Sequence, residues 1–347
     1  MTDQKERKMG LEEIIAEIKK GLTIDNDKNI EYLQEQMEKY AKSEYREEIY
    51  RECSKMIYDM LPKEETEEFQ KAVENDLKSI YQKLGEANTL AIDGKYEEAL
   101  KITTPLSNIA DKIPFFKDDK RTEYYSFTEL FEEILYKQIH KPEREVKRAD
   151  FPFADIYYVH AKVLHGLNKF EEEENVLGKA RKWNPVSSRI VVQYLENLKA
   201  RGGLDDLYLI AKDVLMYTFR KKDLAAEYRN LGYYFFETKK YKEAVVAYVL
   251  SLRYDNDSDE AISELYYINQ ESGISAEQIS EEDIIEVARN NDFAPGVSQK
   301  ILQLAYGIGM QSADNNQKIA AKYFLSIVDG YVDDEDVKKK LKELEEK

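Results

Sequence analysis

The sequence predicts an all-α protein of stacked helical hairpins with an N-terminal helical extension. Three observations predict this fold class. From Leu11 onward nearly every segment places apolar residues three and four positions apart, and no stretch alternates like a half-buried strand. Only 14 Gly and 7 Pro occur in 347 residues, which is few for a chain rich in β-turns. Finally, part of the chain repeats with a period near 34 residues.

Residues 1–62 form the first predicted segment, with helices beginning near Leu11, Ile30 and Tyr45. Cys53 lies on the apolar side of the third helix, so we expect a small buried hydrophobic residue. It is the only cysteine and cannot form an intramolecular disulfide. Pro62 ends this segment, because proline disfavours helix at the residue before it, and a long helix is expected from about residue 63 to 91.

Three consecutive copies of one pattern cover residues 154–256. The copies begin at Ala154, Ser188 and Ala225, so successive starts are 34 and 37 residues apart. Each copy predicts two helices joined by a short turn, and stacked hairpins are what bury the apolar stripe that a lone hairpin exposes.

The third copy carries the clearest motif. It contains Tyr-x-x-Leu-Gly-x-x-Phe at residues 228–235, and Ala244-x-x-x-Tyr248 follows in the second helix. This order resembles the W-x2-L-G-x2-Y…A-x3-F pattern of the tetratricopeptide-repeat (TPR) family, with Lys239 at the glycine position of the family's turn. The resemblance implies a right-handed α-α superhelix of TPR-like helical hairpins. This array covers residues 63–330, with an insertion at about 113–153 and a capping helix at 331–347.

Partial copies extend the pattern in both directions. Residues 94–99 (Gly-Lys-Tyr-Glu-Glu-Ala) read as another turn between helices, although Pro105 should kink the helix that follows. Residues 304–327 suggest a degenerate closing hairpin. Two segments break the period: a helix expected from Tyr124 to about Ile139 inside the insertion, and an acidic helix at about 281–290.

In TPR proteins the first helix of each hairpin lines a concave groove that holds an extended peptide or a partner's helix. The resemblance therefore implies a protein-binding scaffold or adaptor. The basic residues of the predicted groove, interleaved with aromatic ones, suggest an acidic or C-terminal peptide as its ligand. An alternative is that these are ordinary solvated helix faces and that the next helix buries Tyr267. The groove positions carried over to this chain are Tyr158, Lys162, His165, Arg189, Gln193, Lys199, Arg229, Asn230, Tyr233, Phe236 and Tyr267.

Charge and hydropathy narrow the range of partners. The formal net charge of −17 disfavours nucleic acid, because a phosphate backbone would be repelled. The longest apolar run, residues 244–250, is far shorter than the roughly 20 residues of a membrane span. The charged N-terminus shows no secretory signal. We expect a cytoplasmic protein with another protein or a peptide as its partner, without nucleic acid or membrane.

The chain shows no pattern of residues typical of catalysis, cofactors or metal ions. His160 and His165 are five residues apart, which places them on different helix sides, and His160 is expected to be a packed core residue. Acidic runs such as residues 171–174 are expected to be solvated or to favour a helix N-terminus. The sequence thus predicts no enzyme. A peptide-sensing regulatory receptor of the TPR type, with residues 11–61 as its effector bundle, remains the alternative.

Overall fold

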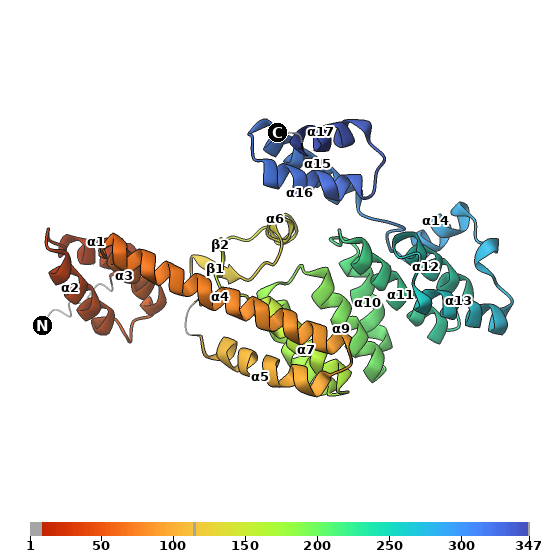
Figure 1. Cartoon of the computed structure of the whole chain (residues 1–347), viewed down its shortest axis with the longest axis horizontal. Coiled ribbons are helices and arrows are strands. Elements are labelled where there is room, and N and C mark those ends of the chain that lie inside the picture. Colours follow the sequence, from red (N-terminus) through yellow and green to blue (C-terminus); the bar gives the residue numbers. More distant parts are fainter. Residues whose placement is uncertain (1–8, 114–115, 346–347) are drawn as a thin grey trace, which may run out of the picture. The chain divides into compact units, whose positions relative to one another are not determined.

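The computed structural model describes residues 9–113 and 116–345, except for the side chains of residues 63–73 (Figure 1). The ends of the predicted N-terminal and C-terminal segments, residues 1–8 and 346–347, therefore lie outside the described residues. The chain divides into two compact units. Unit 1 comprises residues 1–83, 113–124 and 143–147, and unit 2 comprises residues 84–112, 125–142 and 148–347. One boundary falls within the long helix α4 (Lys63–Ile92), and parts of the predicted insertion belong to unit 1.

Unit 1 contains the three helices that the N-terminal sequence predicts, α1 (Leu11–Lys20), α2 (Asn26–Lys39) and α3 (Arg46–Met60). Their apolar sides meet in one core in which Leu33, Ile49 and Cys53 are fully buried. The prediction that Cys53 is a buried free thiol is confirmed.

Two short strands in the insertion correct the expectation that no segment is a strand. They are β1 (Thr122–Tyr125) and β2 (Glu145–Arg148), which form a two-stranded sheet. The backbone N–H of Glu145 donates to the carbonyl of Arg121, and the N–H of Ala149 donates to that of Tyr125, so the strands run parallel. The helix expected from Tyr124 begins only at Leu130, as α6 (Leu130–His140). The Thr and Tyr residues of β1 favour a strand, but a segment of four residues is too short to show an alternating pattern.

Unit 2 is an α-α superhelix of helical hairpins, as the sequence predicts. Paired helices pack along each other and successive hairpins stack. The helix after Gly94 continues through Pro105, so the proline does not end it, and the kink stays a prediction. Besides the end of α4, α6 and a 3-10 turn η1 (Ala276–Gln278), unit 2 contains α5 (Tyr96–Lys112), α7 (Phe153–Gly166), α8 (Phe170–Trp183), α9 (Ser188–Arg201), α10 (Leu204–Val214), α11 (Lys221–Glu237), α12 (Tyr241–Tyr254), α13 (Asp259–Ser272), α14 (Glu281–Asn290), α15 (Gln299–Asp314), α16 (Lys318–Asp329) and α17 (Glu335–Glu345).

One turn geometry recurs in five hairpins. Each turn has a single residue with positive φ, namely Gly94, Asn168, Gly202, Lys239 or Asn316, and the second helix begins two residues later. The N–H of the residue after it donates to the carbonyl five residues back, at 2.8–2.9 Å. This bond satisfies a carbonyl that the ending helix leaves free. The α15–α16 pair has the same turn, so it is a hairpin of the same kind.

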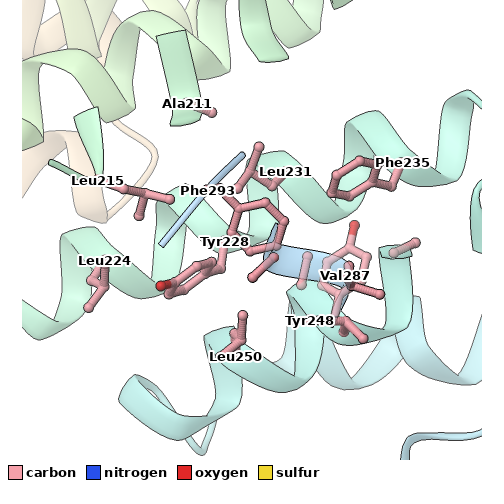
Figure 2. Close-up of a cluster of buried hydrophobic side chains, with 14 of the residues drawn as sticks. Ala211, Leu215, Leu224, Tyr228, Leu231, Phe235, Tyr248, Leu250, Val287 and Phe293 are labelled. Carbon is pink, nitrogen blue, oxygen red and sulfur yellow. The ribbon is translucent and has the colours of Figure 1, made fainter. Parts of the chain in front are cut away.

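The largest core cluster surrounds α11 and α12 (Figure 2). Tyr228, Leu231 and Phe235 of α11 and Tyr248 of α12 have 0–1% of their surface exposed. A Cβ on Gly232 would lie 2.7 Å from Cε2 of Tyr248, so glycine permits the close approach of these two helices. The motif residues of the third copy are thus packing residues. At the end of the chain, Val337 of α17 is fully buried against α15 and α16.

None of the described helices is long and apolar enough to cross a lipid bilayer.

A carboxyl group lies in the core of unit 2. Glu227 of α11 is fully buried, and its Oε1 accepts a hydrogen bond of 2.7 Å from the hydroxyl of Thr218. Its Oε2 has no hydrogen-bond partner among the described residues. Burial raises the pKa of Glu227 well above its ordinary value, because the low dielectric of the core disfavours the ionised form. The group is therefore a neutral acid at pH values where an exposed glutamate is charged.

Lys239 is expected to strain its turn. A residue with a Cβ at φ +61° is less stable there than glycine. We expect Lys239→Gly to raise the free energy of unfolding by up to about 1 kcal/mol, measured by denaturant unfolding. The neighbouring Lys240 has φ −91° and serves as the matched control. Lys240→Gly should lower stability by about 0.5–1 kcal/mol, and equal effects of the two changes would contradict the assigned turn geometry.

Glu227 should make stability depend on pH. Above pH 4.5, the ordinary pKa, the unfolded chain releases this proton while the folded chain retains it, so stability falls as pH rises toward the folded-state pKa. Gln does not titrate. The difference in Tm between Glu227→Gln and the wild type should therefore shift in favour of the variant as pH rises from about 5 to 8. Glu237→Gln, at an exposed position of the same helix, is the control and should show no such trend.

Candidate functional site on the first helices

The predicted groove residues all lie on the first helices of the hairpins. α7 packs beside α9 and α9 beside α11, and side-chain contacts join α13 to both α9 and α11. We call the shared side of these four helices the first-helix face. Most of its predicted residues are partly exposed: Tyr158, Lys162, His165, Arg189, Gln193, Lys199, Arg229, Tyr233 and Phe236, with Tyr267 the most exposed at 52%.

Ion pairs join the helices across this face. Arg189 of α9 binds Asp155 of α7, and its guanidinium also donates to the Thr128 hydroxyl. Nζ of Lys199 lies 3.1 Å from a carboxylate oxygen of Glu260 on α13. The predicted basic residues are Lys162, Arg189, Lys199 and Arg229. The last three therefore have carboxylate partners within the chain. The predicted basic strip is not a free positive surface.

Arg229 is held by two carboxylates at once. Its guanidinium lies 3.2 Å from Asp255 and 3.1 Å from Glu260, and only 16% of its side chain is exposed. Because Glu260 also binds Lys199, this carboxylate ties α9, α11 and α13 together. Such a network fixes the spacing of the first helices, so the side chains on this face are already held in place.

Lys162 differs from the other predicted cations. Its Nζ donates a hydrogen bond of 2.8 Å to Oδ1 of Asn88 on α4, and it forms no ion pair within the described part of the chain. Burial lowers the pKa of Lys162, and the positive charge of Arg189 lowers it further. A ligand carboxylate placed here would relieve both effects, so Lys162 is the best position on this face for an acidic group.

The α11–α13 end of the face is aromatic. The rings of Phe236 and Tyr267 meet edge to face at 5.5 Å between centroids. Nζ of Lys199 lies 4.9 Å from the ring centre of Tyr233. Because half of the Tyr267 surface is exposed, the alternative that the next helix buries this side chain is wrong. Tyrosines that expose a ring and a hydroxyl are typical anchors for protein ligands.

The side chains of two predicted groove residues make hydrogen bonds inside the protein. Asn230 is fully buried, and its Nδ2 donates to Glu196 at 3.0 Å and to the carbonyl of Ala226. The prediction that Asn230 lines the groove is therefore wrong, since its side chain braces two helices from within. Nε2 of Gln193 donates 2.7 Å to Oε1 of Glu173, so this amide is also engaged internally.

Glu173 is the main feature that the sequence analysis missed. It belongs to an acidic run expected to be solvated, yet its side chain is fully buried. Besides Gln193, its carboxylate accepts a hydrogen bond of 2.8 Å from Nδ2 of Asn197 and lies 2.9 Å from Nδ1 of His165. The hydrogen bond to Glu173 raises the pKa of His165, while burial opposes that shift. A buried carboxylate needs such partners to offset its desolvation.

A signal for this burial was present in the repeat. Glu173 stands three residues after the first residue of its helix, Phe170. The same position holds Ala99 in α5 and Ala244 in α12, and both alanines are fully buried. Alignment of the turns therefore predicts that Glu173 faces the core.

The other polar candidates are structural. His160 is buried as predicted, its Nδ1 lies 2.9 Å from the Thr103 hydroxyl, and burial lowers its pKa to about 4. Among the described residues no three His, Cys, Asp or Glu side chains are grouped so that they could hold a metal ion.

A hollow of about 410 Å³ lies at the start of α15, and its lining includes none of the predicted groove residues. Tyr254 and Tyr331 form part of its wall, and Lys221 and Arg253 supply positive charge. Arg253 is engaged with Glu281.

Comparison with known proteins found no match to any family model and none to any curated protein. The assignment of chemistry to this chain therefore rests on its own residues and geometry.

The His165–Glu173 contact should be measurable by a double-mutant cycle with His165→Ala and Glu173→Ala. We expect Glu173→Ala to lower the free energy of unfolding by roughly 2–4 kcal/mol, because it leaves buried donors without an acceptor. Since its folded-state pKa is raised, protonated His165 adds stability below pH 6.5, and this contribution is lost as pH rises through that pKa. The coupling energy should be larger at about pH 6 than at about pH 9, and an equal value would contradict a charged pair.

Proposed function

We propose that this chain is a non-enzymatic, TPR-type scaffold that binds an extended segment of another protein on its first-helix face. The observation that carries the proposal is a continuous face that is built from four first helices and braced by ion pairs. It still exposes aromatic rings and Lys162, for which the described residues supply no carboxylate partner. Bracing supports binding because a surface that is already ordered loses little entropy when a ligand docks.

The groups that the face exposes suggest which ligand chemistry would fit it. An acidic side chain or a C-terminal carboxylate would pair with Lys162 and complete its hydrogen bonding, which Asn88 alone begins. Apolar or aromatic side chains would pack on Phe236 and Tyr267 at the other end. Arg189, Lys199 and Arg229 would position these groups through the ion pairs within the chain rather than bind an anion directly.

The proposal places the protein in the cytoplasm. Its single cysteine is buried and unpaired, which agrees with a fold that does not depend on disulfides. The net charge of −17 supports a protein or peptide partner over nucleic acid.

A peptide array tests the proposal. Twelve-residue peptides that combine acidic and aromatic residues should bind the wild-type protein better than peptides in which lysine replaces each acid. For the best binder, Lys162→Met and Tyr267→Ser should each weaken affinity roughly tenfold or more, because each removes a contact worth about 1.5 kcal/mol or more. Affinity can be measured by fluorescence anisotropy.

Lys182→Met is the matched control, since Lys182 is an exposed lysine on a second helix, α8, and not on a first helix. Binding that is unchanged in the Lys162 and Tyr267 variants, or weakened equally by Lys182→Met, would exclude the first-helix face as the site.

A further inference from the structure

The hairpin pattern is interrupted at α13. In the preceding pair, α11 and α12 pack along each other. α13 ends at Gly273, whose φ of +76° resembles that of the hairpin turns, but no long helix follows directly. The chain continues through η1 to α14, and both η1 and α14 pack on α12. α12 lies between α13 and α14 in Figure 1, so α14 does not take the place of a second helix for α13.

This interruption leaves one side of α13 exposed. α13 buries Ala261 and Ile268, and it packs on α12. Ile262 and Tyr266 are four residues apart, so they share a side of the helix, and they are 50% and 70% exposed. Tyr267, the next residue, is turned by about 100° toward the first-helix face.

The same positions are buried in the three copies that precede α13. The residues 34 positions earlier are Tyr228, which is fully buried, and Gly232, which is buried against the second helix α12. In the two copies before that, the pairs at these positions are also buried, with at most 3% exposed: Tyr157 and Ala161 in α7, Val191 and Leu195 in α9. Ile262 and Tyr266 therefore stand where a hairpin normally packs its second helix.

Charge indicates what would cover this side. Residues 254–288 contain no Lys, Arg or His but eleven Asp and Glu. Four of these carboxylates form ion pairs with neighbouring helices: Asp255, Glu260, Glu281 and Asp283. The other seven form no ion pair within the described residues, and among them are Asp257, Asp259 and Glu271, which flank the exposed side of α13 in sequence.

We propose that the exposed side of α13 docks a basic amphipathic helix of a partner protein, which occupies the place of the missing second helix. Ile262 and Tyr266 take the apolar stripe of that helix, and the surrounding carboxylates take its Lys and Arg side chains. A helix fits this position better than an extended strand, because the repeat geometry places a helix there in every preceding copy. Charge complementarity favours a basic partner and disfavours an acidic one. This surface is separate from the first-helix face and does not depend on the function proposed above.

The probe is a synthetic 18-residue peptide with a leucine stripe along one helix side and lysines elsewhere. A scrambled peptide of the same composition shows how much binding comes from charge alone on this acidic protein. A version with glutamate in place of lysine tests the charge requirement. Fluorescence anisotropy should show that the amphipathic lysine peptide binds at least about tenfold tighter than either, with affinity falling as salt rises because the contacts are charge-assisted.

The variant Ile262→Ser/Tyr266→Ser should weaken binding of the lysine peptide about tenfold or more. Its matched control is Leu209→Ser/Ile319→Ser, which removes two exposed apolar residues, 53% and 85% exposed, on other helices. Circular dichroism establishes that both variants fold. Tyr267→Ser should leave this peptide bound while it weakens the acidic peptides of the first-helix face, so the two proposals fail separately.

Three results would overturn the proposal. The first is equal binding of the lysine peptide and its scrambled form. The second is unchanged affinity of the Ile262→Ser/Tyr266→Ser variant. The third is a wild-type dimer, seen by analytical ultracentrifugation, that this variant dissociates, because a second copy of the chain would then cover α13.

Discussion

The hairpin turn is the constraint on which the stack depends. A single residue in the left-handed region, followed by a hydrogen bond to the carbonyl five residues before the donor, reverses the chain and sets where the second helix starts. Because the start is fixed, the residue five positions after the left-handed one always meets the first helix. That residue is fully buried in all five hairpins: Ala99, Glu173, Leu207, Ala244 and Ala321. The repeat therefore fixes geometry more strictly than residue identity.

In the α7–α8 hairpin this buried position holds Glu173, which requires polar partners around it. A buried carboxylate must be offset by donors, and Asn197, Gln193 and His165 supply them from the first helices. Polar residues that look like ligand contacts in sequence thus hold neighbouring hairpins together. The same holds for the arginines, whose carboxylate partners lie on adjacent helices. For the proposed ligand this leaves Lys162, which forms no ion pair within the described residues, and the aromatic end of the face.

The predictable features of the fold are those that the period repeats. The hairpins over residues 154–256 follow from matching turns and matching buried positions, and α15–α16 shares the same turn. The strands β1 and β2 were missed because four residues show no period. The neutralisation of the predicted site was also missed, although a signal existed: Arg189 follows Asp155 by 34 residues, and Asn230 follows Glu196 by 34. Residues one period apart lie side by side on successive first helices, so opposite charges at that spacing predict a pair.

At the end of the regular stack, exposed side chains are no longer explained by packing between hairpins. After α13 the chain does not extend the stack in the same way. Instead, α15 and α16 gather around Phe131 of α6, whose ring contacts Phe219 and Phe324. An array that simply ends requires a polar outer side on its last helix, since no neighbour covers it. α13 instead exposes Ile262 and Tyr266 in a stretch of sequence with seven carboxylates that form no ion pair with any described residue. Exposed apolar groups on a final repeat favour association over solubility, which is why we propose an interface on this side of α13 rather than a cap.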